Sequence, residues 1–340
     1  MNWRWSIVAG LILMGTSVVK PSLGSDLPKV AATFVSAWGK EGSAPGDFNI
    51  PIGIAIHESG VIFITDHYNN RVQSFNAQGK LLSHFSVLPN PGGIAIRGDA
   101  LYIGHFPSSR LSADRTPDRV SVYSVKGEFL REWGSTGVGD GQFDMVGGIA
   151  ISRDGEVFVA DQTNRRVQVF DSEGKFLRKW GEYGVLPGQF GGNVSAKSRV
   201  GGPQFIAIDS VGSVFTTEAS VGRVQQFSKT GTPVLAWGNL EDKPGSFGGK
   251  FAAMKANLIG PIGVCADAQD RLWISAVSGR VQCFTRDGQF LGGLGDAQGT
   301  EPGQFLAPHG VAITPNGELF VVDTYNHRVQ KFKVALGETD

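Results

Sequence analysis

The sequence is poor in cysteine and carries no net charge. It has two cysteines, and its 31 Lys and Arg residues balance 31 Asp and Glu residues. A neutral chain has no overall electrostatic attraction for nucleic acid, so we expect no nucleic-acid partner. Cys265 and Cys283 are predicted to lie in two strands separated by a third. That spacing is too wide for a disulfide, whose Cα atoms approach within about 7 Å.

The sequence also lacks the common signatures of catalysis. It contains no Gly-x-Ser-x-Gly elbow, no phosphate-binding glycine loop and no Cys-x-x-Cys pair. Beyond residue 24, no apolar run approaches the roughly 20 residues that a membrane-spanning helix needs. These absences favour a non-enzymatic protein that has no cofactor and no membrane span once its leader is removed.

The first residues predict that leader. Arg4 precedes an apolar stretch from Ile7 to Val19, and Ser22-Leu23-Gly24 supplies small residues at a cleavage site. We therefore expect a signal peptide over 1–24, a short linker over 25–32, and a secreted or periplasmic protein.

Glycine is abundant, with 48 residues, and one pattern recurs six times. Its Arg-Val pairs, spaced 47 to 57 residues apart, begin at Arg71, Arg119, Arg166, Arg223, Arg280 and Arg328. Repeats of about 40 to 50 residues with four short strands each are typical of β-propeller blades. The sequence therefore predicts an all-β, six-bladed propeller over 33–334, followed by a tail over 335–340.

The last repeat is completed from the other end of the chain. In three repeats a Trp-Gly pair stands fourteen residues after the arginine, at Trp133, Trp180 and Trp237. The same offset from Arg328 falls beyond the C-terminus, whereas Trp38-Gly39 stands near the start. An N-terminal strand in the last blade would cover its open edge, so we expect it to close the ring.

A seven-residue motif links three of the repeats to a known family. It runs Asp66-x-x-Asn69-x-Arg71, Asp161-x-x-Asn164-x-Arg166 and Asp323-x-x-Asn326-x-Arg328, each followed by Val. On these residues the chain resembles the NHL-repeat family, which implies a propeller fold. Because the family includes binding modules and enzymes, the resemblance implies little about activity. In the fourth and fifth repeats, Glu218 and Ser275 stand five residues before the arginine, where the motif has Asp.

We interpret the Asp and Arg residues of this motif as structural ion pairs. They are Asp66 with Arg71, Asp161 with Arg166, and Asp323 with Arg328. The same pair recurs at equivalent places in several repeats, whereas a catalytic group breaks the symmetry of a repeat.

Long loops on one face of the disc are the predicted binding surface. They cover 105–118, 191–203 and 240–261, and irregular loops on a rigid scaffold commonly bind partners. The candidate ligand- or partner-binding residues are Arg110, Arg115, Lys197, Arg199, Lys250, Lys255, Gln204 and His309. We expect a monomer that binds a protein or a small anionic ligand there, as a binding or scaffolding module.

The alternative is a lyase or hydrolase at the mouth of the channel. The blades resemble those of the peptidylglycine amidating lyase, and this resemblance implies a zinc ion held by three histidines at the axis. His309 matches one such position, whereas the equivalent residues are Ile52, Gly92, Gly147, Gln204 and Ile262. His309 is therefore the catalytic candidate of this alternative, with zinc or calcium at His67, His105 and His309 as its metal hypothesis.

Overall fold

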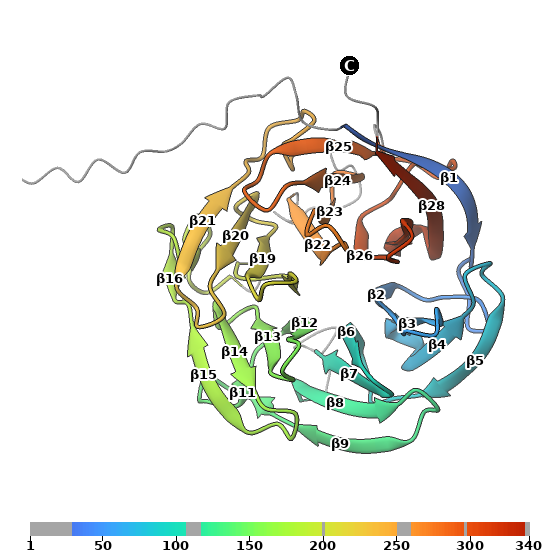
Figure 1. The fold of residues 1–340 in the computed structure, drawn as a ribbon. Coiled ribbons are helices and arrows are strands. Elements are labelled where there is room, and N and C mark those ends of the chain that lie inside the picture. Colours follow the sequence, from blue (N-terminus) through green and yellow to red (C-terminus); the bar gives the residue numbers. More distant parts are fainter. Residues whose placement is uncertain (1–28, 107–116, 199–200, 250–259, 296–297, 337–340) are drawn as a thin grey trace, which may run out of the picture.

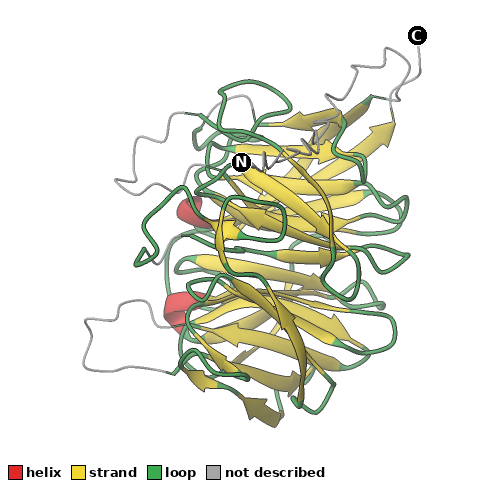
Figure 2. Cartoon of the chain, turned by 90° about the vertical axis from the view of Figure 1, so that its left-hand side faces the viewer, coloured by secondary structure: helices red, strands yellow, loops and turns green. Residues whose placement is uncertain are grey.

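The computed structural model describes residues 29–106, 117–198, 201–249, 260–295 and 298–336. This part of the chain is almost entirely β structure, arranged as sheets around a central axis (Figure 1). Two short 3-10 helices, η1 (His67–Asn69) and η2 (Thr324–Asn326), lie on the same side of the disc (Figure 2). No helix in the described ranges is long and apolar enough to cross a membrane.

Four sheets contain four consecutive strands each, and we number them as units 1 to 4. Unit 1 contains β2 (Pro51–Ile56), β3 (Ile62–Asp66), β4 (Arg71–Phe75) and β5 (Leu81–Ser86). Unit 2 contains β6 (Pro91–Arg97), β7 (Ala100–His105), β8 (Arg119–Ser124) and β9 (Phe129–Trp133). Unit 3 contains β12 (Val146–Ile151), β13 (Val157–Asp161), β14 (Arg166–Phe170) and β15 (Phe176–Trp180). Unit 4 contains β18 (Ile206–Ile208), β19 (Val214–Glu218), β20 (Arg223–Phe227) and β21 (Pro233–Trp237).

Short parallel pairs lie in the loops that lead into units 3 and 4. They are β10 (Ser135–Thr136) with β11 (Gln142–Phe143), and β16 (Tyr183–Gly184) with β17 (Phe190–Gly191).

An eight-stranded sheet joins the last two units. Unit 5 contains β22 (Pro261–Ala266), β23 (Leu272–Ala276), β24 (Arg280–Phe284) and β25 (Phe290–Leu294). Unit 6 contains β26 (Pro308–Ile313), β27 (Glu318–Asp323), β28 (Arg328–Leu336) and the N-terminal β1 (Val30–Trp38). β1 pairs antiparallel with β28, from Val30 opposite Leu336 to Trp38 opposite Val329. The all-β propeller is confirmed, and the strand order is compatible with six blades closed by the N-terminal strand.

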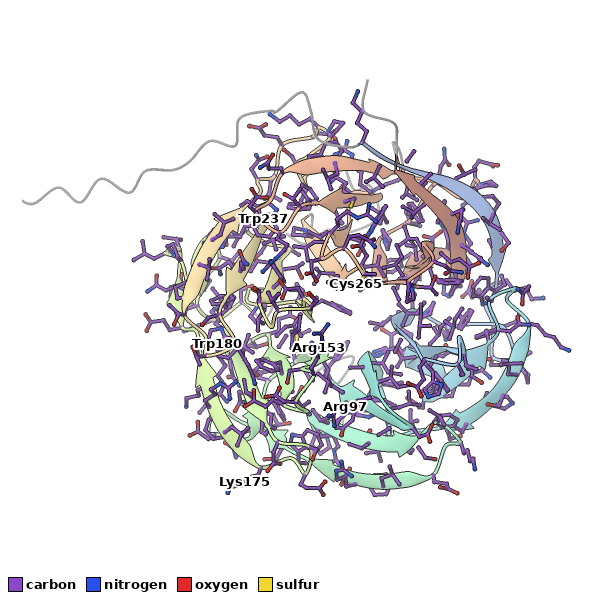
Figure 3. The ribbon with its side chains drawn as sticks, viewed as in Figure 1. Arg97, Arg153, Lys175, Trp180, Trp237 and Cys265 are labelled. Atoms are coloured by element: carbon purple, nitrogen blue, oxygen red, sulfur yellow. The ribbon has the colours of Figure 1, made fainter. Side chains whose placement is uncertain are left out.

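The hydrophobic core lies between neighbouring sheets. Ile64 and Phe75 of unit 1 pack in one buried cluster with Phe320 and Val329 of unit 6, and equivalent clusters fill the other interfaces. At the rim, tryptophans of the outer strands cover the tight turns of the next unit. A Cβ atom on Gly231, which has a φ of +92°, would lie 2.5 Å from the ring of Trp180. Figure 3 shows Trp180 and Trp237 at this outer position.

Near the axis the inner strands approach each other too closely for side chains. A Cβ atom on Gly147 would lie 2.1 Å from the carbonyl oxygen of Gln204, and one on Gly263 would lie 1.9 Å from that of His309. Glycine is therefore required at these contacts, and it sets where Gln204 and His309 stand.

The Asp and Arg residues of the repeat form one buried network in each of several units. Arg71 donates from Nε to Oδ2 of Asp66 over 2.7 Å, and both side chains are buried. The corresponding distances are 2.7 Å for Arg166 with Asp161 and 2.8 Å for Arg328 with Asp323. The guanidinium groups also donate to carbonyl oxygens of the preceding loop, such as those of Ser43, Ala44 and Asp47 at Arg71. The network therefore ties each lead-in loop to its own sheet.

In unit 5 the turn between the second and third strands, β23 and β24, is shorter than the spacing of the sequence motif had predicted. The ladder puts Ala276 opposite Arg280 and Ser275 opposite Val281. The count that placed Ser275 at the Asp position was therefore wrong by one residue. Ser275 instead matches Thr65 of unit 1, because each hydroxyl accepts from the amide of an inner-strand glycine and donates to a carbonyl of the next unit.

Unit 2 departs from the repeat in another way. His105 lies opposite Arg119 in the ladder between β7 and β8, where unit 1 has Asp66 opposite Arg71. The imidazole is buried and bonded through Nε2 to the hydroxyl of Ser121 over 2.6 Å. Arg119 pairs instead with Glu132 over 2.7 Å.

The two cysteines are free. Trp273 lies between them in the ladder, paired with Cys265 on β22 and with Cys283 on β24.

Candidate functional site

A cavity of about 190 Å³ opens at the axis of the disc, on the side that carries η1 and η2. We call it the axial cavity, and we call this side of the disc the loop face. The cavity is lined by Ile50, Ile52, His67, Tyr68, Gly93, Phe106, Met145, Gly147, Gln162, Gln204, Phe205, His309, Thr324 and Tyr325. None of these residues is Asp, Glu, Lys or Arg.

Backbone bonds fix the turns that bring the lining residues to the axis. The amide of His67 donates to the carbonyl of Ile50, and the amide of Gln162 donates to that of Met145. Ile50 and Met145 are in the left-handed region, with φ values of 57° and 61°. A branched residue such as Ile50 rarely adopts this conformation, which costs on the order of 1–3 kcal/mol. Asn90 and Ala307 adopt it at the equivalent position, so this turn is a feature of the repeat.

Two histidines of the axial cavity have fixed tautomers. Nδ1 of His67 lies 3.0 Å from the carbonyl oxygen of Pro91, and Nδ1 of His309 lies 2.8 Å from that of Ala307. Since a carbonyl oxygen can only accept, each Nδ1 carries the proton, and each neutral ring keeps a lone pair on Nε2.

Both of these rings are neutral near pH 7. Burial lowers the pKa of His67 to about 4, against the opposing effect of the Pro91 carbonyl. Burial also lowers the pKa of His309. The ring of His67 stacks on Phe106 at 4.9 Å between centroids and meets Tyr68 edge-on at 4.8 Å. The cavity therefore presents hydrogen-bond acceptors in an aromatic, uncharged setting.

Two other polar side chains of the axial cavity lack hydrogen-bond partners within the described ranges. Gln204 is 8% exposed and its Nε2 is buried without a partner, and Thr324 is 1% exposed with an unpartnered hydroxyl. A buried donor left unpaired costs about 1–3 kcal/mol, so such groups in a cavity point to a ligand or to ordered water.

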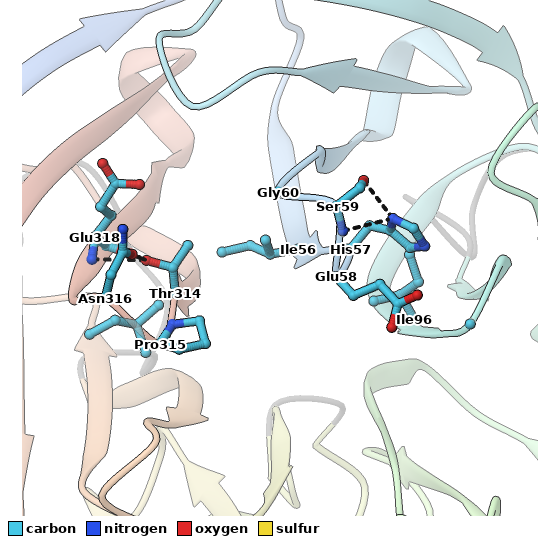
Figure 4. Close-up of a pocket in the computed structure, with 12 residues that line it drawn as sticks. Ile56, His57, Glu58, Ser59, Gly60, Ile96, Thr314, Pro315, Asn316 and Glu318 are labelled. Atoms are coloured by element: carbon cyan, nitrogen blue, oxygen red, sulfur yellow. Dashed lines mark hydrogen bonds between the residues drawn. The ribbon is translucent and has the colours of Figure 1, made fainter.

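The opposite side of the disc, the turn face, has a larger hollow of about 660 Å³ (Figure 4). It is lined mainly by the tight turns after the inner strands of units 1 and 6. Some polar groups there bond within their own turns: His57 Nδ1 lies 2.6 Å from the hydroxyl of Ser59, and Thr314 bonds to Asn316. Others pair outside them: His57 Nε2 lies 3.4 Å from a carboxylate oxygen of Asp99, and Glu318 pairs with Lys331 over 2.6 Å. These bonds fix the turns, and the axial cavity is the better candidate site.

The structure brings some of the sequence-predicted residues together and separates others. Gln204, His309 and His67 all line the axial cavity, whereas His105 is absent from its lining. No group of three or more His, Cys, Asp or Glu side chains in the described part of the chain could hold a metal ion. Five predicted cationic residues lie outside the described residues: Arg110, Arg115, Arg199, Lys250 and Lys255.

The sixth predicted cationic residue, Lys197, is exposed on a loop that is held in place by hydrogen bonds from Arg165 of unit 3. Arg165 donates to the carbonyl oxygens of Ser195 and Ser198 over 3.0 and 2.9 Å, and its guanidinium lies over the ring of Tyr183 at 5.3 Å. The first part of the 191–203 loop is therefore held on unit 3.

Sequence reasoning missed the aromatic rim of the axial cavity. Tyr68 and Tyr325 are 50% and 37% exposed, and each stands two residues after the Asp of its repeat. This shared offset could have predicted the two tyrosines at the cavity, because the Asp ends the second strand of each unit and the residues that follow it line the cavity. Phe205, which also lines the cavity, carries no such regular offset.

Comparisons with known proteins identify NHL repeats in two segments and support the fold. The NHL repeat model matches residues 48–75 and 305–332. Protein brain tumor of Drosophila melanogaster is 25% identical over 125 residues, which cover 36% of this chain. The matched region spans 12% of the length of that relative.

Solved propellers match nearly the whole chain at low identity. A structural genomics protein of unknown function from Bacteroides thetaiotaomicron is 14% identical, with a TM-score of 0.64 over 90% of this chain and 77% of its own. A virginiamycin B lyase from Staphylococcus aureus is 14% identical, with a TM-score of 0.53 over 90% and 99%. A gluconolactonase from Xanthomonas campestris is 15% identical, with a TM-score of 0.57 over 91% and 95%. At these identities the likeness shows the fold alone.

Proposed function

Because the chain contains two NHL repeats and has a propeller fold, we propose that it is a binding module that receives its partner on the loop face, with the axial cavity at the centre of the contact. The observation that carries this proposal is the pair of unpartnered polar side chains, Gln204 and Thr324, buried in an aromatic-lined cavity.

The surroundings of the axial cavity also suit binding. Exposed aromatic side chains that rim a pocket supply large contact areas with few rotatable bonds, and they are enriched at protein interfaces. Tyr68 and Tyr325 stand at this rim. A protein is the first candidate partner, and a small anionic ligand is the alternative.

Site-directed photo-cross-linking tests the location of the partner. A benzoylphenylalanine replaces Tyr325 on the loop face in one variant, and Val211 on the turn face in a matched control. Val211 is 67% exposed, so the benzoylphenylalanine at the control position is at least as accessible as the one at position 325. We expect a cross-linked adduct from position 325 and none from position 211. Equal adducts from both positions would reject the loop face as the binding surface.

A lyase or hydrolase at the channel mouth is the second candidate. One observation favours it: the rings of His67 and His309 line the same cavity, each with an unprotonated Nε2 that can take a proton from a substrate. The test is a panel of ester, lactone and amide substrates, with His309→Gln as the comparison. Turnover by the native protein that the variant lacks supports this candidate, and identical background rates reject it.

We also propose export, supported by the leader-like residues 1–24. Mass spectrometry of the protein from its native host tests this proposal. A mature N-terminus near residue 25 supports export. Protein that is found inside the cell and still carries residues 1–24 rejects it.

A further inference from the structure

The size of the axial cavity limits what it can hold. Pockets for drug-sized ligands have volumes of roughly 300–1,000 Å³, whereas this cavity has about 190 Å³. It therefore accommodates one side chain or one small group, while the rest of a larger partner lies outside, against the rim formed by Tyr68 and Tyr325.

The lining excludes a charged group. No lining residue within the described part of the chain has a full charge near neutral pH, since His67 and His309 are neutral there. A carboxylate or an ammonium group would lose its water without gaining an opposite charge, and that cost is large. The bound group is therefore uncharged.

The hydrogen-bond donors and acceptors that line the cavity narrow the chemical class of the bound group further. His67 and His309 each present an Nε2 lone pair, which requires an N–H or O–H of the ligand. Gln204 has an unpartnered amide, and Thr324 has an unpartnered hydroxyl that can donate. The complementary group has at least two donors and one acceptor within a few atoms of one another.

We propose that the axial cavity binds one uncharged primary carboxamide, which an Asn or Gln side chain of a protein partner inserts from the loop face. The two N–H bonds of the carboxamide pair with Nε2 of His67 and His309, and its carbonyl oxygen accepts from Gln204 or Thr324. This inference rests on the proposed binding function and names the chemistry of its partner.

The apolar part of the lining matches the stem of such a side chain. Ile52, Met145 and Phe106 contribute hydrocarbon surface beside the polar groups. A hexose fits less well, because several of its hydroxyl groups would face the apolar walls formed by Ile52, Met145 and Phe106. Each hydroxyl left without a partner would weaken binding.

Three small probes separate a carboxamide from groups of similar shape. Acetamide has the two N–H donors, N,N-dimethylacetamide lacks them, and acetate replaces them with a negative charge. The full-length protein is labelled with ¹⁵N-histidine, and the imidazole nitrogens are followed by NMR during each titration near neutral pH. We expect acetamide to give saturable shifts of Nε2 in His67 and His309, and the other two probes to give none. D-Glucose is titrated as a further arm.

Every alternative response overturns the proposal. Equal shifts with acetate indicate an anion site, equal shifts with N,N-dimethylacetamide indicate an apolar site, and equal shifts with glucose indicate a sugar site. No shift with any probe also rejects the carboxamide. Adducts from position 325 in the cross-linking experiment would then show that the binding function stands although this inference has failed.

Two variants assign the response to the cavity. Gln204→Leu removes the amide at similar volume, and Thr324→Val removes the hydroxyl with nearly the same shape. We expect about tenfold weaker binding of acetamide by at least one of them, the loss that one hydrogen bond of about 1.4 kcal/mol represents. Unchanged melting temperatures verify the fold, and unchanged affinity in both variants contradicts the proposed contacts. If Gln204→Leu fails to fold, the isosteric Thr324→Val still tests them.

A peptide comparison then tests the protein source of the group. Peptides of sequence acetyl-Gly-Gly-Xaa-Gly-Gly, with Gln, Glu or Leu at Xaa, are coupled through their C-terminus to a surface to gain avidity. We expect retention on the Gln peptide that exceeds retention on the Glu and Leu peptides by about tenfold or more. Equal retention on all three rejects an inserted side-chain carboxamide.

Discussion

Arg223 donates a hydrogen bond from Nε to Oε1 of Glu218 over 2.6 Å, as Arg71 does to Asp66 over 2.7 Å. Val221 stands where unit 1 has Asn69, so the side-chain amide that donates to the carboxylate there has no counterpart. The extra methylene of Glu218 still lets its other oxygen accept from the amide of Gly191 over 3.0 Å. Asp66 accepts from the amide of Asn49 in the same way. Glu218 therefore departs from the repeat in sequence and keeps its structural role.

Replacing Glu218 by Ala is expected to destabilise the protein strongly. The variant leaves the guanidinium of Arg223, whose side chain is 11% exposed, without its carboxylate, and breaking a buried pair costs about 3–5 kcal/mol. Urea denaturation measures the loss. Asp140→Ala is the matched control, because it removes an exposed partner of Lys179 and is expected to cost about 0–1 kcal/mol. Similar stability of the two variants would contradict the buried network.

The hydroxyls that bridge neighbouring units are expected to be structural. Ser275→Ala leaves the amide of Gly263 without its acceptor, and Thr65→Val does the same at Gly53. We expect each variant to lose about 1–3 kcal/mol of unfolding free energy, measured by thermal and urea denaturation. Full stability of both variants would mean that the hydroxyls do not hold the ring.

Acid is expected to destabilise the fold through buried histidines. Burial lowers the pKa of His105 from 6.5 to about 4, so between these values the unfolded chain binds more protons than the native protein. Stability therefore falls as the pH falls, by about 1.4 kcal/mol per pH unit for this residue. Urea denaturation between pH 7 and about pH 4 compares the native protein with His105→Asn. The slope of the variant should be smaller by that amount, and an equal slope would show that His105 is not held neutral.

The two thiols are expected to be unreactive in the folded protein. Burial raises the pKa of Cys283 to about 12 and that of Cys265 further still, whereas the thiolate is the reactive form. Ellman's reagent near pH 8 should label neither thiol in native protein and both in guanidinium chloride. Rapid labelling of native protein would place a thiol at the surface.

The fold was predictable from the sequence because the repeat depends on a few strongly constrained residues. The Arg-Val pairs mark the third strand of each unit, and Trp38 near the N-terminus marks the strand that completes unit 6. The ladder positions of Ser275 and His105 were not predictable by counting. A turn shorter by one residue shifts unit 5, and unit 2 has a histidine where the motif has a carboxylate.

The candidate site was predictable in part. Gln204 and His309 follow from the alignment of the inner strands, since both stand immediately before the tightly packed segment of their strand. The tautomers of the histidines and the missing partners of Gln204 and Thr324 depend on carbonyls and side chains from other units. Such relations arise from packing around the axis, and spacing along the chain does not encode them.

The antiparallel pairing of β1 with β28 has a mechanical consequence. Val30 and Leu336 face each other, so both ends of the described chain leave the disc at the same corner. A pulling force applied between these ends would load the backbone hydrogen bonds one after another, as in a zipper, and not all together. We therefore expect the edge formed by β1 to separate from β28 under less tension than strands pulled along their own length would need.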